Sequence, residues 1–226
     1  MENPKTIIFG ASGFLGSNFV ETLTKLERDY LAVTSSPDGP SSYLHFNPQE
    51  HEVGILEEAI SRFKPNQLLF LAAYKDDHLF ISAPEDAYEK HFAINFEYYR
   101  LAARAIIATP LSYFERSLLY VSSSKLTYGE PGTSLYSATK AASCALTKTI
   151  SKEYARFGVR ANNLHLGYFG GPLWDKIPQK KRDILANEPA LKRLGRRKDF
   201  NHFALAVLDN SYLTGQDLRL DGGLIG

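Results

Sequence analysis

The chain has 226 residues, a net charge of +1 and a single cysteine, Cys144. This length suits one α/β domain with a sizeable core. The charge excludes a global attraction to nucleic acid or membranes, and the lone cysteine excludes an internal disulfide. No apolar run is as long as a membrane span, and the N-terminus has no signal-peptide pattern. These features together predict a cytoplasmic protein with no nucleic-acid or membrane partner. The histidines do not show the spacing of metal ligands, so we expect no metal site.

Short apolar segments alternate with helix-like segments along the chain. Strands are predicted at 5–9, 30–34, 43–46, 67–72, 117–122, 160–166 and 217–220, and helices near 14–28, 49–63, 85–108, 134–157 and 199–209. Such alternation is typical of a parallel sheet that is covered by helices on both faces. The sequence therefore predicts an α/β fold, a doubly wound parallel sheet in three layers, as a single domain over residues 1–226.

A glycine-rich turn joins the first predicted strand to the first helix and reads Gly10-Ala11-Ser12-Gly13-Phe14-Leu15-Gly16. In such a turn the first glycine permits the tight bend, the second lets the backbone approach a pyrophosphate, and the third allows close helix–strand packing. The N–H groups at the start of the helix would face the phosphates. A purely structural turn is the alternative. The motif favours a Rossmann-like, dinucleotide-binding domain.

The end of the second predicted strand bears on the choice of cofactor. It reads Ala32-Val33-Thr34-Ser35-Ser36, without the acidic residue that binds the adenosine ribose of NAD and without an arginine for the 2′-phosphate of NADP. Serine hydroxyls can bind a phosphate. We therefore expect NADP in preference to NAD.

Tyr136 and Lys140 lie four residues apart on a predicted helix, so they share one face. An ordinary tyrosine has a pKa of about 10, and a nearby ammonium should lower it. Tyr136 could then transfer a proton to or from a reacting oxygen. Ser123 ends the strand 117–122 and could hydrogen-bond the same oxygen, although only its spacing to Tyr136 distinguishes it from the neighbouring serines.

These motifs, in this order, resemble the short-chain dehydrogenase/reductase family. The resemblance extends to Asn95, which matches a helix asparagine that holds a water linked to the active-site lysine. It also extends to the segments 160–167 and 213–223. It implies an enzyme that interconverts a carbonyl and a secondary alcohol, with the catalytic residues Asn95, Ser123, Tyr136 and Lys140. The implied cofactor-binding residues are Gly10, Ser12, Gly13, Phe14, Leu15, Ser35, Asn47, Ala72, Ala73, Tyr136, Lys140 and Gly167.

Some positions depart from the single-domain branch of that family. The glycine spacing is that of the extended branch, which acts on nucleotide sugars, and Gly171 stands where a threonine often contacts the nicotinamide amide. Two alternatives stay open: a nucleotide-sugar epimerase or dehydratase that holds its cofactor tightly, and a non-catalytic cofactor sensor.

Two further segments suggest partners. The segment 167–198 is predicted to form a substrate loop or lid, and its part 175–198 carries nine Lys/Arg against three acids, a net +6. That charge could attract an anionic substrate or carrier, or it could be a solvated surface.

The aromatic residues of 85–108 and the alanines of 134–157 predict a homo-oligomer, either a dimer or a tetramer, because small residues let helices of two subunits approach closely.

Overall fold

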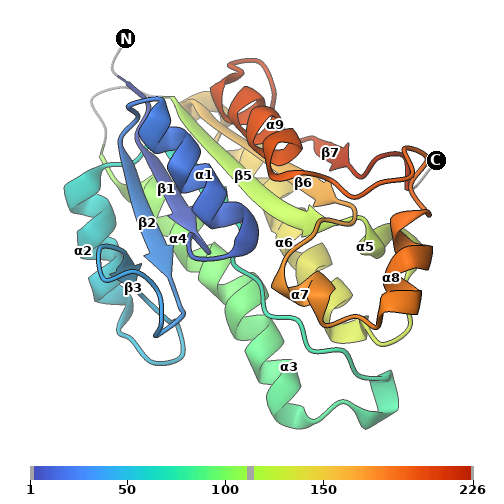
Figure 1. The fold of residues 1–226 in the computed structure, drawn as a ribbon. Coiled ribbons are helices and arrows are strands. Elements are labelled where there is room, and N and C mark those ends of the chain that lie inside the picture. Colours follow the sequence, from blue (N-terminus) through green and yellow to red (C-terminus); the bar gives the residue numbers. More distant parts are fainter. Residues whose placement is uncertain (1–2, 111–114, 225–226) are drawn as a thin grey trace.

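Seven strands form one parallel sheet at the centre of the molecule (Figure 1). The structure is a computed structural model and describes residues 3–110 and 115–224. In chain order the strands are β1 (Thr6–Phe9), β2 (Tyr30–Thr34), β3 (Leu44–His45), β4 (Gln67–Phe70), β5 (Arg116–Ser123), β6 (Val159–Leu166) and β7 (Asp217–Leu220). They lie in the order β3-β2-β1-β4-β5-β6-β7, so the chain reverses direction across the sheet between β1 and β4. In such sheets, ligands bind at the carboxyl ends of the strands at this reversal.

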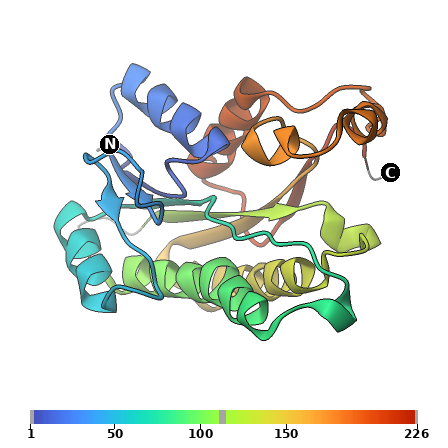
Figure 2. The ribbon, with the colours of Figure 1, turned by 60° about the horizontal axis from the view of Figure 1, so that its bottom comes forward.

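The central strands are apolar because both of their faces are covered. Every residue of β1, β4 and β5 is buried. One face carries α1 (Phe14–Lys25) and α9 (Arg197–Asp209). The other carries α2 (Val53–Phe63), α4 (Tyr98–Ala108) and α6 (Ser134–Glu153), and Figure 2 shows the resulting three layers. The predicted fold class and its seven strands are confirmed.

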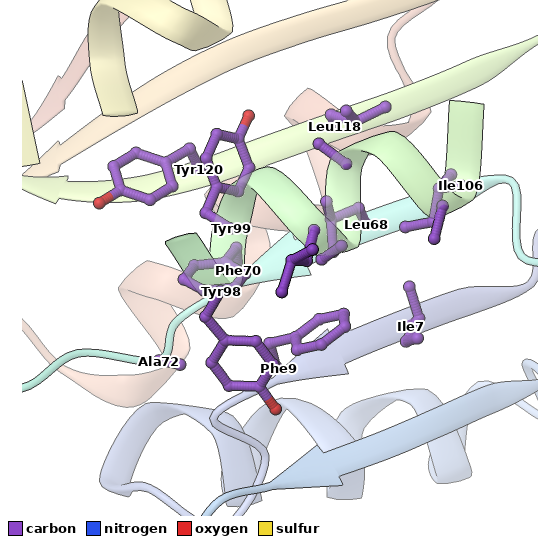
Figure 3. Close-up of a cluster of buried hydrophobic side chains, with 14 of the residues drawn as sticks. Ile7, Phe9, Leu68, Phe70, Ala72, Tyr98, Tyr99, Ile106, Leu118 and Tyr120 are labelled. Carbon is purple, nitrogen blue, oxygen red and sulfur yellow. The ribbon is translucent and has the colours of Figure 1, made fainter. Parts of the chain in front are cut away.

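Aromatic side chains fill the core between the sheet and α4 (Figure 3). Tyr98 and Tyr99 are both fully buried, and each hydroxyl has a partner: Tyr98 donates to the Phe46 carbonyl oxygen at 2.9 Å, and Tyr99 shares a 2.8 Å hydrogen bond with the Thr147 hydroxyl. Buried tyrosine hydroxyls need such partners. These two aromatics of the segment 85–108 therefore belong to the core.

The predicted helix 85–108 is divided into three parts. It runs as α3 (Glu85–Phe92), a single π-helical turn η2 (Ala93–Glu97) and then α4. A π-turn inside an α-helix is uncommon and often lies at a functional site. Here it contains Asn95, which the sequence had already singled out.

The predicted lid 167–198 contains two short helices, α7 (Pro172–Asp175) and α8 (Gln179–Ala186), and no strand within those residues. Pro172 begins α7, where a proline's missing N–H removes no helix hydrogen bond. Pro178 is the N-cap of α8. The remaining short helices are α5 (Lys125–Tyr128), η1 (Phe80–Ser82) and η3 (Ala155–Phe157). Across the part of the chain that the structure describes, no helix combines the length and apolar character needed to cross a bilayer.

Candidate active site

The glycine-rich turn has a geometry that side chains would prevent. Gly10 has φ +81°, which favours glycine, and a Cβ there would lie 2.7 Å from the backbone nitrogen of Ala72. A Cβ at Gly16 would lie 2.2 Å from the carbonyl oxygen of Gly10. Gly13 caps α1, whose first turn has neither a capping side chain nor an acidic residue. The free N–H groups and the positive end of the helix dipole therefore fit a pyrophosphate group.

The residues predicted around the rest of the cofactor lie at several strand ends. Ser12 and Thr34 share a 2.6 Å hydrogen bond between their hydroxyls, and Ser35 is exposed directly after β2. Asn47 follows β3, but its side-chain oxygen accepts the Gln49 N–H at 3.1 Å within a local turn. That oxygen therefore already accepts one hydrogen bond from the protein.

Ala72 and Ala73 follow β4, beside the glycine turn. Ala72 is buried against Gly10 and Ala73 is exposed. Gly167 follows β6, where a Cβ would lie 2.7 Å from the Cα atom of Asp221. The close approach of the chain after β7 is thus sufficient reason for a glycine at this position.

Ser123, Tyr136 and Lys140 meet at the carboxyl end of β5. Ser123 is the last residue of β5, Tyr136 lies in the first turn of α6, and Lys140 follows one turn later. The Ser123 side chain hydrogen-bonds the Tyr136 hydroxyl. The Lys140 ammonium nitrogen lies 5.9 Å from the centroid of the Tyr136 ring. The spacing of these residues in the sequence therefore correctly indicated that they are neighbours.

The three neighbouring serines face different partners, which the sequence could not show. The Ser122 side chain lies beside the thiol of Cys144, and the Ser124 hydroxyl lies 3.4 Å from a carboxylate oxygen of Asp221. Only Ser123 faces Tyr136.

Lys140 is a buried cation without an acidic partner among the described residues. Only 2% of its surface is exposed, and its ammonium donates a 2.9 Å hydrogen bond to the Val121 carbonyl oxygen. It also lies 4.8 Å from the centroid of the Tyr120 ring, a cation–π contact. Burial lowers the pKa of Lys140 to about 8.

The pKa of Tyr136 shifts in the direction opposite to the one expected. Burial raises it to about 12, and the hydrogen bond from Ser123 opposes that rise. The expectation that the ammonium alone would lower this pKa is therefore wrong for the protein by itself. Desolvation of the phenolate is the largest cause of the rise, and the Lys140 ammonium is not among the groups that shift this pKa.

Asn95 holds the loop after β4 against α6. Its side-chain oxygen accepts the Tyr74 N–H at 2.8 Å, and its amide nitrogen donates to the Tyr74 carbonyl at 2.9 Å and to the Thr139 hydroxyl at 3.1 Å. Its own carbonyl oxygen accepts hydrogen bonds from Tyr120 at 3.0 Å and Ser143 at 2.9 Å. Among the described residues no hydrogen bond joins Asn95 to Lys140, and a water on the Asn95 carbonyl oxygen, as the resemblance implies, would have to compete with two side chains.

Sequence reasoning missed Tyr120. Its hydroxyl reaches Asn95 while its ring faces Lys140, so it connects the two residues. A tyrosine in an otherwise apolar buried strand, three residues before Ser123, was the available signal.

The lid begins directly after β6 and carries aromatic and basic residues. Tyr168 follows Gly167, and its ring lies 5.9 Å from that of Trp174 and 6.0 Å from the Lys125 ammonium. Arg182 and Arg193 pair with acids inside the segment or in α9. Other cations of the segment are exposed: Lys176, Lys180, Lys181, Arg196, Arg197 and Lys198.

A cavity of about 440 Å³ lies elsewhere, between α9 and the end of β7. Phe169, Arg193 and His202 contribute to its lining, whereas Ser123, Tyr136 and Lys140 do not. We therefore do not assign the reaction to it. Within residues 3–110 and 115–224, no group of three or more His, Cys, Asp or Glu side chains is arranged to hold a metal ion.

Comparisons with known proteins identify relatives of this chain in sequence and in fold. Residues 55–225 match the model of a family described as enoyl-(acyl carrier protein) reductase. The chain is 25% identical to 3-oxoacyl-(acyl-carrier-protein) reductase FabG of Thermotoga maritima, over 97% of this chain and 91% of that protein. It is 29% identical to human (3R)-3-hydroxyacyl-CoA dehydrogenase, over 75% of this chain and 67% of that protein. A crystal structure of a short chain dehydrogenase/reductase family oxidoreductase from Burkholderia thailandensis has the same fold, with a TM-score of 0.87 at 20% identity over 100% of this chain and 94% of that one.

Proposed function

Because the chain belongs to the short-chain dehydrogenase/reductase family and is an NAD(P)-dependent oxidoreductase, we propose that it interconverts a carbonyl and a secondary alcohol with Tyr136 as general acid and base. The observation that carries this proposal is the meeting of Ser123, Tyr136 and Lys140 at the carboxyl end of β5. A cofactor sensor would not need a proton-transfer group beside a buried lysine.

The roles of the residues follow from their protonation states. When bound, the nicotinamide supplies or accepts the hydride. With a pKa of about 12, Tyr136 is protonated at neutral pH and can donate its proton to a carbonyl oxygen during reduction. Ser123 can hydrogen-bond the same oxygen. The Lys140 ammonium then stabilises the phenolate that remains, and a pKa of about 8 keeps most of it charged at pH 7.

The cofactor would lie across the reversal between β1 and β4. We assign the pyrophosphate to the turn formed by Gly10, Ser12, Gly13, Phe14 and Leu15, because α1 begins there with free N–H groups. Ser35 and Asn47 would lie on the adenosine side. Ala72, Ala73 and Gly167 would line the path toward Tyr136, which together with Lys140 would contact the nicotinamide riboside.

For the substrate we propose a 3-oxoacyl thioester or its 3-hydroxy product. Two relatives of the chain are named for acyl-carrier-protein and CoA thioesters. Both carriers are anionic, which suits the exposed cations of the segment 175–198.

The proposed function is tested by steady-state oxidation of NADPH and NADH with a panel of ketones. The panel includes acetoacetyl-CoA, a simple ketone without a carrier, and a 4-keto sugar nucleotide. We expect turnover with acetoacetyl-CoA. Failure with every ketone, or epimerisation of a sugar nucleotide without net cofactor consumption, would contradict the proposal.

We expect NADPH to bind more tightly than NADH. No acidic side chain follows β2 to repel a 2′-phosphate, and the hydroxyls of Ser35 and Ser36 can receive it. Calorimetric titration of the protein with each cofactor measures the difference. Tenfold tighter binding of NADH would refute the preference and leave the assignment of the glycine turn intact.

We expect the enzyme to be a homo-oligomer. Tyr88 is 47% exposed and forms an aromatic row with Phe92 and Phe96 along α3 and η2. On α6, the small residues Ala138 and Ala141 are exposed. Two copies could pair through these helices about a two-fold axis. Light scattering should therefore give a dimer or a tetramer.

The matched variants are Ala141→Arg on α6 and Ser61→Arg on α2, both at exposed positions. The first should shift the protein toward smaller species, because it places like charges across the proposed axis, and the second should leave the mass unchanged. An active wild-type monomer of about the chain mass of 25.3 kDa would contradict the oligomer.

A further inference from the structure

Arg197 stacks on the first residue of the phosphate-binding helix. Arg197 begins α9 and Phe14 begins α1, and the two helices lie side by side on one face of the sheet (Figures 1 and 2). The central guanidinium carbon of Arg197 lies 4.1 Å from the centroid of the Phe14 ring. Arg197 is exposed, and no Asp or Glu among the described residues pairs with it.

The Phe14 ring is held from a second direction by Gly171. This glycine has φ +116°, and a Cβ there would lie 2.6 Å from Cγ of Phe14. Neither the backbone conformation nor the space admits the threonine that often stands at this position in the single-domain branch of the family. Phe14 takes that space and serves as a platform for the guanidinium.

The position of Arg197 is unfavourable for α9 itself. A cation at a helix N-terminus is destabilising, because the helix dipole has its positive end there. Arg196, Arg197 and Lys198 occupy the N-cap and the first two helical positions of α9, and only Asp199 counters them. The start of α1 next to Arg197 also has no acidic residue in its first turn. Positive charge is therefore gathered from two elements at one place, which an anion would stabilise.

We propose that Arg197 binds the pyrophosphate of the dinucleotide cofactor. This inference rests on the proposed function, which puts that group at the N-terminus of α1. A planar guanidinium can donate two parallel hydrogen bonds to a phosphate. Stacking on Phe14 orients it beforehand, so that less side-chain freedom is lost on binding. Because the pyrophosphate is common to NAD and NADP, the contact does not discriminate between them.

The test compares Arg197→Met with Lys198→Met. Methionine keeps an apolar chain over Phe14 and removes the charge. Lys198 is the next exposed cation of the same helical turn, and it is Arg197, not Lys198, whose charged group lies over the Phe14 ring. The dissociation constants of NADPH, NADH and ADP-ribose are measured by calorimetry. ADP-ribose is included because it contains the pyrophosphate without the nicotinamide.

We expect Arg197→Met to weaken the binding of all three ligands by about tenfold or more, because hydrogen bonds between two charged groups are stronger than neutral ones. Lys198→Met should change each dissociation constant by less than about twofold. Arg197→Lys keeps the charge without the planar fork, and we expect an intermediate loss. Thermal melts check that the variants are folded.

Three results would overturn the assignment of Arg197 while leaving the proposed function standing. The first is unchanged binding by Arg197→Met. The second is a loss confined to NADPH, which would place Arg197 on the 2′-phosphate. The third is a loss for NADPH and NADH but not for ADP-ribose, which would place it on the nicotinamide half. Wild-type protein that binds none of the three ligands would instead refute the proposed function, and the inference with it.

Discussion

Tyr136→Phe is expected to lower kcat by about 10²–10⁴-fold, the range typical of a lost general acid. The substitution removes only the hydroxyl that Ser123 hydrogen-bonds and leaves the ring in place between Ser123 and Lys140. Cofactor binding and folding should therefore change little. The measurement is steady-state kinetics of reduction together with a cofactor titration on the same preparation.

Ser123→Ala is the matched comparison. It removes a hydrogen bond to the reacting oxygen and leaves the acid in place, so its effect on kcat should be smaller than that of Tyr136→Phe. Near-normal turnover by Tyr136→Phe would refute the proposed mechanism. A larger loss in Ser123→Ala than in Tyr136→Phe would reverse the assigned roles.

Lys140→Met is expected to abolish most turnover and also to stabilise the fold at pH 7. The Lys140 pKa of about 8, compared with an ordinary value of 10.5, means that folding disfavours its charged form. Such a difference corresponds to a penalty on the order of 3 kcal/mol at neutral pH. Part of it is offset in the variant by the lost hydrogen bond to Val121, so we expect a net gain of about 1–2 kcal/mol in the free energy of unfolding.

The stability advantage of Lys140→Met over the wild type should depend on pH. Between pH 8 and 10.5 the unfolded chain binds a proton at Lys140 that the folded protein does not, so wild-type stability rises with pH in that window. The advantage of Lys140→Met should therefore shrink from pH 8 to 10.5. Wild-type turnover should fall as the pH rises from 8 to 10.5, because the Lys140 ammonium loses its proton. Urea unfolding at several pH values checks the first effect, and a variant less stable than wild type at pH 7 would contradict it.

Local patterns in the sequence were sufficient to predict the fold class, the glycine-rich turn and the proximity of Tyr136 to Lys140. Apolar runs marked the central strands β1, β4 and β5, because both faces of the sheet are buried there. The glycine spacing marked the turn before α1, because Gly10 and Gly16 leave no room for a side chain. The spacing of Tyr136 and Lys140 placed them together, because one helical turn covers four residues. Each of these relations is set by neighbours in the chain.

The tertiary structure alone decided what surrounds these residues. Burial determines whether the pKa of Tyr136 rises or falls, and burial depends on the packing of α6 against the sheet. Tyr120 reaches Asn95 only because β5 and η2 come together, and the π-turn that holds Asn95 has no signature in the residue pattern. Phe14 and Arg197 meet because α1 and α9 share a face of the sheet, although nearly the whole chain separates them. Contacts of this kind depend on side-chain direction and packing between distant elements, which periodicity and spacing do not encode.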